Sequence, residues 1–265
     1  MPTIVSQMRG NRASFGRSFG FFDTQIIGHL LSQSWGPTWM RVSITILLLM
    51  ISEVAIAGPL EEADSAFNRG DFGLARNGYS ELANQGDRIA QFKLGVLYDE
   101  GNGVDKNSRE AIRWYCISSA QGFPEAAYNL GRLYQDGRGI PQNFERARQW
   151  YLIAAGRGET KAAVNLGVMN ASGEGGRRDY RTAIGWFLFA AQRGDERAKN
   201  NLGTMYFNGQ GVSRDLVRAH MWYNLAAAQG DAEAIQNRAS VAHLMTAKQI
   251  ARAQKMASER QMYVP

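Results

Sequence analysis

Side chains that could carry catalysis are sparse in this sequence of 265 residues. Three histidines are present, His29, His220 and His243, and none stands near an acid or a nucleophile with the spacing of a catalytic triad or a metal site. Cys116, the single cysteine, follows two aromatic residues on an apolar helix face, which favours a small core side chain over a reactive thiol. We therefore expect no catalytic residues.

Glycine-rich loops could hold a phosphate or a calcium ion, and the sequence argues against both. No Gly-x-Gly pair is followed by the Gly-Lys-Ser/Thr end of a P-loop, and none follows a predicted strand. Asp99 and Glu110 have the spacing of the first and twelfth ligands of an EF-hand, but Gly101 and Gly103 occupy ligand positions between them. We predict no metal and no cofactor.

The charge balance is only mildly basic. Thirty Lys and Arg against 24 Asp and Glu give a net charge of +6. Residues 1–57 end in a predicted signal-peptide cleavage site and carry four arginines and two acids. Without them, the chain has 26 basic and 22 acidic residues, a net charge of +4. Acids are interspersed with the basic residues near Arg177 and in the last helix, so we expect no nucleic-acid partner.

Residues 40–57 have the pattern of a secretory signal peptide. Met40-Arg41 precedes the apolar run 42–51, and Ala55-Ile56-Ala57 supplies a small-x-small cleavage site. The run is about half of the roughly 20 apolar residues that span a bilayer. We expect cleavage after Ala57, a periplasmic or secreted protein and no stable transmembrane anchor; an uncleaved, membrane-anchoring signal is the alternative. Residues 1–39 are either a disordered leader or an over-extended start before Met40.

The elements that would position any site come from an internal repeat. Four tryptophans are spaced 36 residues apart, and the same period relates Leu-Gly pairs, Gly-x-Gly pairs, alanines and closing glycines. The tryptophans are Trp114, Trp150, Trp186 and Trp222, and the Leu-Gly pairs begin at Leu94, Leu130, Leu166 and Leu202. Five columns in register over four units cannot arise by chance.

Each unit is predicted to be a helix, a glycine loop, a second helix and a turn. Residues 90–99 have the apolar spacing of an amphipathic helix. Gly95 inside this helix costs about 1 kcal/mol relative to Ala, so a column of such glycines predicts a close approach by the partner helix. The second helices follow short polar residues that can serve as N-caps: Asn107, Asn143, Asp179 and Asp215.

The motif A-x-x-N-L-G-x-x-Y-x-x-G-x-G-V, followed by A-x-x-W-Y-x-x-A-A-x-x-G, resembles the Sel-one-like repeat family of the tetratricopeptide superfamily. Residues 126–158 fit almost every position, and the resemblance covers about 90–233. It implies an all-α fold, an α-solenoid of stacked antiparallel helix hairpins, and adaptor roles. A cysteine-rich subgroup proposed to bind β-lactams is similar but carries paired cysteines, which this chain lacks.

The predicted organisation follows the repeat period. A tetratricopeptide-like first hairpin at 61–89 precedes repeats at 90–125, 126–161, 162–197 and 198–233, and 234–265 holds a half-repeat and a C-terminal capping helix. Thr246 and Gln249 have the spacing of a capping box for that helix.

The third repeat departs from the pattern at its glycine loop. Asn170 stands where other units have Tyr, and Gly176 stands where they have Val or Ile. Losing two apolar anchors predicts either a rearranged loop or a gap filled by another group. We expect 170–179 to be the least stable loop of the array, with faster amide hydrogen exchange than 135–143; a ligand pocket here is the less favoured alternative.

Partner binding is the remaining candidate function. The residue before each Leu-Gly pair forms a polar ladder that should line the concave face of the solenoid: Lys93, Asn129, Asn165 and Asn201. Asparagine amides can hydrogen-bond an extended peptide, although a packing role within each unit is equally open. Neighbours expected to set specificity are Gln91, Phe92, Tyr128, Arg132, Val164, Val168, Lys199 and Thr204.

We therefore expect an exported, non-enzymatic adaptor or regulator in the bacterial cell envelope that binds another protein or peptide in this groove. A protein that binds or hydrolyses peptidoglycan or another cell-wall glycan is one alternative, and a secreted factor acting on a host is another. The sequence does not predict an oligomeric state.

Overall fold

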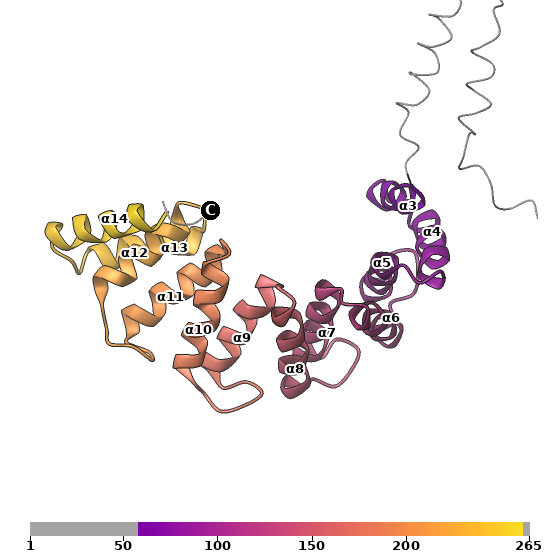
Figure 1. Ribbon diagram of the computed structural model, residues 1–265, viewed down its shortest axis with the longest axis horizontal. Coiled ribbons are helices and arrows are strands. Elements are labelled where there is room, and N and C mark those ends of the chain that lie inside the picture. Colours follow the sequence, from indigo (N-terminus) through magenta and orange to yellow (C-terminus); the bar gives the residue numbers. More distant parts are fainter. Residues whose placement is uncertain (1–57, 262–265) are drawn as a thin grey trace, which may run out of the picture. The chain divides into compact units, whose positions relative to one another are not determined.

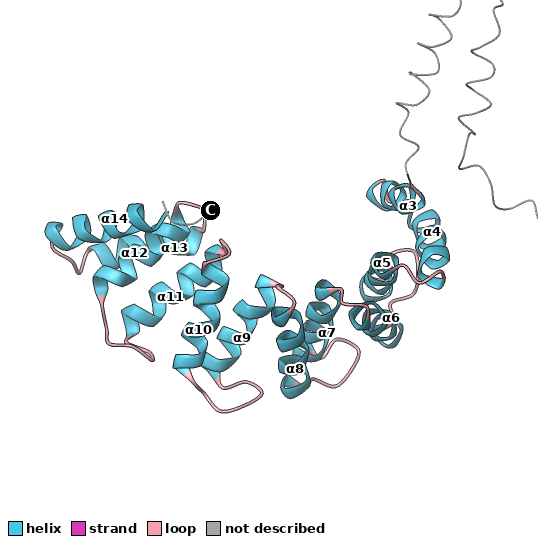
Figure 2. Ribbon diagram, in the orientation of Figure 1, coloured by secondary structure: helices cyan, strands magenta, loops and turns pink. Residues whose placement is uncertain are grey.

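The computed structural model describes residues 58–261, in which Figure 2 shows helices joined by turns and loops. The predicted leader 1–39 and signal peptide 40–57 lie outside the described residues. The helices are α3 (Pro59–Asn68), α4 (Phe72–Asn84), α5 (Arg88–Glu100), α6 (Ser108–Ala120), α7 (Pro124–Asp136), α8 (Phe144–Gly156), α9 (Thr160–Ser172), α10 (Tyr180–Ala191), α11 (Glu196–Asn208), α12 (Leu216–Ala227), α13 (Ala232–Ala242) and α14 (Ala247–Gln261).

Consecutive helices pack as hairpins, as Figure 1 shows from α3 in indigo to α14 in yellow. Helices α3 and α4 form the first hairpin, and the four repeats are α5/α6, α7/α8, α9/α10 and α11/α12. The second helix of each hairpin also contacts the first helix of the next. The predicted all-α fold of stacked 36-residue hairpins is therefore confirmed.

The predicted N-caps are confirmed in all four repeats. The Asn107 side chain accepts hydrogen bonds from the backbone N–H groups of Arg109 and Glu110. Equivalent bonds begin α8, α10 and α12 at Asn143, Asp179 and Asp215. These short side chains satisfy N–H groups that have no partner within the helix, so they define where each second helix starts.

The glycine column in the first helices exists because an aromatic ring lies against it. A Cβ placed on Gly131 would come within 2.5 Å of Cδ1 and Cε1 of Tyr151, and one on Gly95 would come within 2.6 Å of Cδ1 of Tyr115. Phe187 and Tyr223 cover Gly167 and Gly203 in the same way. The predicted close approach is therefore made by an aromatic side chain of the second helix.

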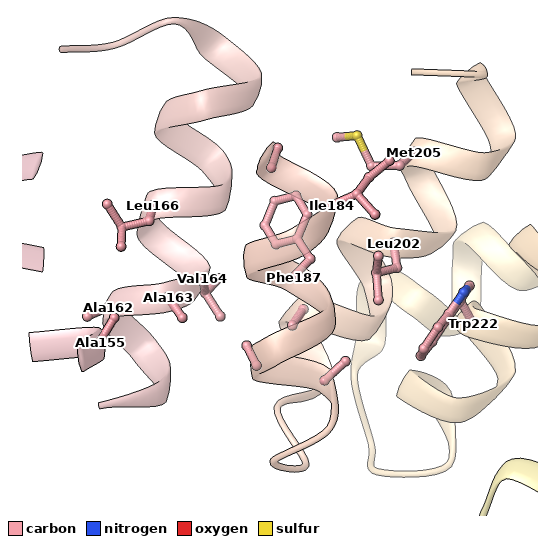
Figure 3. Packing of buried hydrophobic residues seen from close by; sticks show 14 of the residues in the cluster. Ala155, Ala162, Ala163, Val164, Leu166, Ile184, Phe187, Leu202, Met205 and Trp222 are labelled. Atoms are coloured by element: carbon pink, nitrogen blue, oxygen red, sulfur yellow. The ribbon is translucent and has the colours of Figure 1, made fainter. Parts of the chain in front are cut away.

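Buried apolar side chains continue from one hairpin into the next. Figure 3 shows part of the largest cluster, with Leu166 of α9, Phe187 of α10 and Leu202 of α11 labelled. All three are fully buried. Because each hairpin buries its apolar side against its neighbours, the stability of one repeat depends on the next.

Helix α14 covers the end of the described array. Thr246 and Gln249 form the predicted capping box, in which the Thr246 N–H donates to Gln249 Oε1 (2.8 Å) and the Gln249 N–H donates to Thr246 Oγ1 (3.3 Å). Ala253 and Ala257 are buried, and the Arg260 guanidinium lies 4.3 Å from the centre of the Trp222 ring. The predicted capping helix is thus confirmed.

The buried histidine of α12 makes stability depend on pH. His220 is 3% exposed, and its Nδ1 has no hydrogen-bond partner among residues 58–261. Burial, together with the Arg238 guanidinium, lowers the pKa of His220 below its usual value. Protonation therefore favours the unfolded chain, so stability should be unaffected above about pH 6.5 and fall as the pH drops through the folded-state pKa.

Urea unfolding at about pH 7.5 and about pH 5 checks this prediction. His220→Ile, which introduces the residue found at the equivalent positions Ile112 and Ile184, should remove this component of the acid destabilisation. An equal loss of stability in the wild type and the variant would show that His220 does not contribute.

Candidate functional site

The solvent-facing side of the first helices is the surface on which the predicted binding residues stand. We call it the first-helix face and define it by Lys93, Val96, Asn129, Arg132, Asn165, Val168, Asn201 and Thr204. The buried side of the same helices repeats one residue type, Leu94, Leu130, Leu166 and Leu202. The four residues two positions after these leucines are instead Val, Arg, Val and Thr, of which Arg132 and Val168 are exposed and Val96 and Thr204 are half-buried, so the chemistry on this side changes while the core stays the same.

The polar ladder contacts aromatic residues that lie 14 positions earlier in the chain. Asn129 Nδ2 donates to the Tyr115 hydroxyl (3.2 Å), and the Asn165 side chain lies near the Tyr151 hydroxyl, which donates to Gln135 Oε1 (2.6 Å). Lys93 Nζ lies 5.8 Å from the centre of the Tyr79 ring and forms an ion pair with Asp64 Oδ1 (2.9 Å). Burial raises the pKa of Tyr115 and Tyr151, so both hydroxyls stay protonated near neutral pH. Part of the hydrogen-bonding capacity of the ladder therefore stabilises the stacking of neighbouring hairpins.

Asn201 differs from the other ladder asparagines. The residue 14 positions earlier is Phe187, which has no hydroxyl to accept a hydrogen bond. Asn201 is half-buried on α11, and within the described part of the chain its side chain makes no hydrogen bond. Its amide therefore keeps both donors and its acceptor for a group outside the fold.

The other predicted specificity residues divide into packed and exposed ones. Phe92 lies 5.0 Å from Phe123 between ring centres, and Tyr128 lies 5.8 Å from Tyr151, so both aromatic rings pack within the array. Arg132 is exposed on α7, and Val168 is 41% exposed on α9. The side chains most available to a partner are therefore Arg132 and Val168.

Lys199 lies inside the array. Its side chain is buried, and its ammonium group donates to the Gly194 carbonyl (3.2 Å) and to Gln229 Oε1. Burial lowers the pKa of this lysine. Gln91 holds the equivalent place near the start of the array and accepts from Gln121 Nε2 (2.7 Å). Gln91 Nε2 also donates to the Ala83 carbonyl of the preceding hairpin (3.1 Å). Both residues therefore link neighbouring hairpins, a role that was not apparent from the sequence.

The gap in the third repeat is filled by an arginine of the second. Arg148 of α8 donates to Asn170 Oδ1 (2.9 Å), while Asn170 Nδ2 donates to the Leu166 carbonyl (2.7 Å). The loop closes as in the second repeat, since the Asp179 N–H donates to the Asn170 carbonyl and the Asn143 N–H to the Tyr134 carbonyl, both at 2.8 Å. The lower stability expected of loop 170–179 stays a prediction.

The role of Arg148 was not predicted from the sequence, because its unusual residue type becomes visible only when equivalent positions of the four repeats are compared. The equivalent residues are Ile112, Ile184 and His220, so a lone arginine replaces a mostly apolar position. Among residues 58–261 there is no cluster of three His, Cys, Asp or Glu side chains that could hold a metal ion. None of the helices in that range combines the length and hydrophobicity needed to cross a membrane.

A repeated helical hairpin with a constant core and a variable exposed face defines a tetratricopeptide-like repeat protein. The Sel1 repeat model matches residues 88–123, 124–159, 160–195 and 197–231, and the chain belongs to this family. A Sel1 repeat protein from Oxalobacter formigenes is 34% identical, over 68% of this chain and 74% of that one, with a TM-score of 0.64.

Two further solved structures are similar to the chain. A protective antigen of uropathogenic Escherichia coli strains is 28% identical over 78% of this chain and 53% of its own, with a TM-score of 0.47. An immunity protein from Pseudomonas aeruginosa is 19% identical over 75% of this chain and 81% of its own, with a TM-score of 0.45. A comparison with curated proteins found no match.

Proposed function

We propose that the chain is a non-enzymatic adaptor that binds another protein or peptide through the first-helix face. The observation that carries this proposal is the contrast between the invariant leucines under this face and the residues that vary from repeat to repeat on it. A scaffold that keeps its core and changes its surface presents a series of different contacts along one row. Along this face, exposed Arg132 offers a positive charge, exposed Val168 offers apolar area, and the amide of Asn201 offers hydrogen bonds.

Capture of partners by the full-length protein tests this proposal. The double variant Arg132→Glu/Val168→Glu changes the middle of the first-helix face at exposed positions, so it should fold like the wild type. Partners that bind this face should be lost, because a reversed charge and a newly buried carboxylate each oppose binding. Circular dichroism and urea unfolding confirm that the variant is folded.

Arg109→Glu/Gln149→Glu is the matched control. Both residues are exposed on second helices, α6 and α8, and the double variant changes the net charge by the same amount as the test variant. It should keep every captured partner. Retention of all partners by the test variant, or equal loss from both variants, would count against binding through the first-helix face.

We also propose that the protein acts after export, in the bacterial cell envelope or outside the cell. The basic start, the apolar run 42–51 and the Ala55-Ile56-Ala57 site support this proposal. Cell fractionation followed by N-terminal sequencing should find a chain that starts at Gly58 outside the cytoplasm. A cytoplasmic protein that retains residues 40–57 would contradict export, and a membrane-bound protein that retains them would indicate an uncleaved anchor.

A further inference from the structure

A polar pocket lies beside the irregular loop of the third repeat. It is lined by Arg148, Asn170, Arg177, Arg178, Asp179 and Thr182, and its volume is about 530 Å³. We call it the third-repeat pocket. Its residues come from the second helix of one repeat and from the loop and helices of the next, away from the residues that define the first-helix face.

The second repeat provides an internal reference for this pocket. The pocket at the equivalent place has a volume of about 330 Å³ and is lined by Tyr134, Ile140, Pro141, Gln142, Asn143 and Arg146. There, the Arg146 guanidinium lies 5.5 Å from the centre of the Tyr134 ring. In the third repeat, the equivalents of Tyr134, Ile140 and Arg146 are Asn170, Gly176 and Thr182. The third-repeat pocket is thus larger than its counterpart in the second repeat, and the side chains at these three positions are smaller.

Arg148, Arg177 and Arg178 make the pocket positively charged. Asn170 is only 2% exposed, and its hydrogen bond holds one nitrogen of the Arg148 guanidinium in place. A Cβ at Gly176 would lie 4.0 Å from Nη1 of Arg148, so the glycine leaves room beside the guanidinium. Arg148, Asn170 and Gly176 thus act together, because the arginine occupies space that Tyr and Val or Ile fill in the other repeats.

The positive charges of the pocket are not neutralised within the described chain. Neither Arg148, Arg177 nor Arg178 forms an ion pair with any carboxylate of residues 58–261. Asp179 lines the pocket, but its carboxylate accepts hydrogen bonds from the N–H groups of Arg181 and Thr182 and from the Thr182 hydroxyl. Three guanidinium groups and one carboxylate leave a net charge of +2.

We propose that the third-repeat pocket binds a small oxyanion with two negative charges, a phosphate group or a dicarboxylate. The planar fork of a guanidinium matches the oxygens of both groups and can hold them through two parallel hydrogen bonds. Arg148 is held by Asn170, Arg178 donates to the Ser172 carbonyl (3.4 Å), and Arg177 lines the pocket from the loop. A dianion would complete the charge balance of the pocket without displacing any ion pair of the fold.

Titration of the full-length protein with inorganic phosphate, succinate or acetate at constant ionic strength, followed by amide chemical shifts, tests this site. We expect phosphate or succinate to bind at least about tenfold more tightly than acetate, with shifts centred on residues 170–182. Binding of phosphate alone would assign the ligand to phosphate groups, and binding of succinate alone would assign it to dicarboxylates. Equal affinity for all three anions would overturn the proposal.

Repeat-derived variants locate the binding site. Arg148→Ile/Asn170→Tyr/Gly176→Val rebuilds the ordinary loop of the other repeats, so it should fold and lose binding. As single substitutions in the wild-type protein, Arg177→Gln and Arg178→Gln should each weaken anion binding by about tenfold. If the triple variant does not fold, these two variants test whether the pocket is the binding site. The matched control, Arg181→Gln, removes an exposed charge that does not line the pocket and should leave affinity unchanged.

Two outcomes of this set would refute the site. One is a folded triple variant that binds phosphate or succinate as tightly as the wild type. The other is a loss of affinity in Arg181→Gln as large as that in Arg177→Gln, which would indicate a general charge effect.

Discussion

Phe187→Ala is expected to lower the free energy of unfolding by about 3–5 kcal/mol, the largest effect we predict for this chain. Phe187 is fully buried in the largest apolar cluster, in α10 between α9 and α11. Removing the ring loses its burial and leaves a cavity against Gly167, whose lack of a side chain leaves little to refill the space. Urea unfolding followed by circular dichroism gives the change.

Phe187→Tyr is the informative companion to this variant. Tyrosine occupies the equivalent position at Tyr79, Tyr115, Tyr151 and Tyr223. A hydroxyl at 187 would stand where Asn201 can donate to it, as Asn129 donates to Tyr115. We expect stability to change by less than about 1 kcal/mol. A loss in Phe187→Tyr as large as that in Phe187→Ala would show that α10 does not pack in the register of the other second helices.

Gly131→Ala is expected to destabilise the protein by about 1–3 kcal/mol, although alanine is the better helix former. Helix propensity alone would favour the alanine by about 1 kcal/mol. A Cβ at this position, however, would lie 2.5 Å from two ring carbons of Tyr151, a side chain that is fully buried and cannot move aside freely. The ring must shift and disturb its hydrogen bond to Gln135 Oε1 (2.6 Å). Thermal and urea unfolding measure the loss.

Gly185→Ala is the matched control for this effect. Gly185 is also inside a helix, α10, but it is exposed, and no atom lies within 4 Å of the Cβ that would be added. Here only helix propensity acts, so stability should rise by up to about 1 kcal/mol. If Gly131→Ala were also stabilising, contact with the Tyr151 ring could not be the reason for the glycine column.

The 36-residue period was sufficient to predict the hairpins and the N-caps of their second helices, and the spacing of Thr246 and Gln249 predicted the capping box of α14. These features depend on residues close together in the chain: Asn107 caps a helix that starts at the next residue, and Thr246 bonds with Gln249 three positions on. Local hydrogen bonds and helical periodicity need no knowledge of distant contacts, so the sequence pattern is enough to place them.

Contacts between repeats could not be predicted in the same way. Lys199 donates to the Gly194 carbonyl of the preceding repeat, and the Arg148–Asn170 bond joins different hairpins. Asn129 lies on a first helix, as predicted, but its hydrogen-bond partner Tyr115 lies 14 residues earlier, on a second helix. Recognising such pairs requires knowing which side chains the stacking of hairpins brings together, which no single repeat reveals.

The way α14 folds back has a mechanical consequence. At the C-terminal side of the described array, α12 is held by α11, α13 and α14, and Arg260 rests on Trp222. At the other side, the α3/α4 hairpin contacts the rest of the array mainly through α5. In an array whose repeats contact only their neighbours, pulling on the two ends should unfold the hairpins one after another. When tension is applied to the two ends of the protein, the α3/α4 hairpin should detach first, because the packing of α14 on α12 stabilises the opposite end.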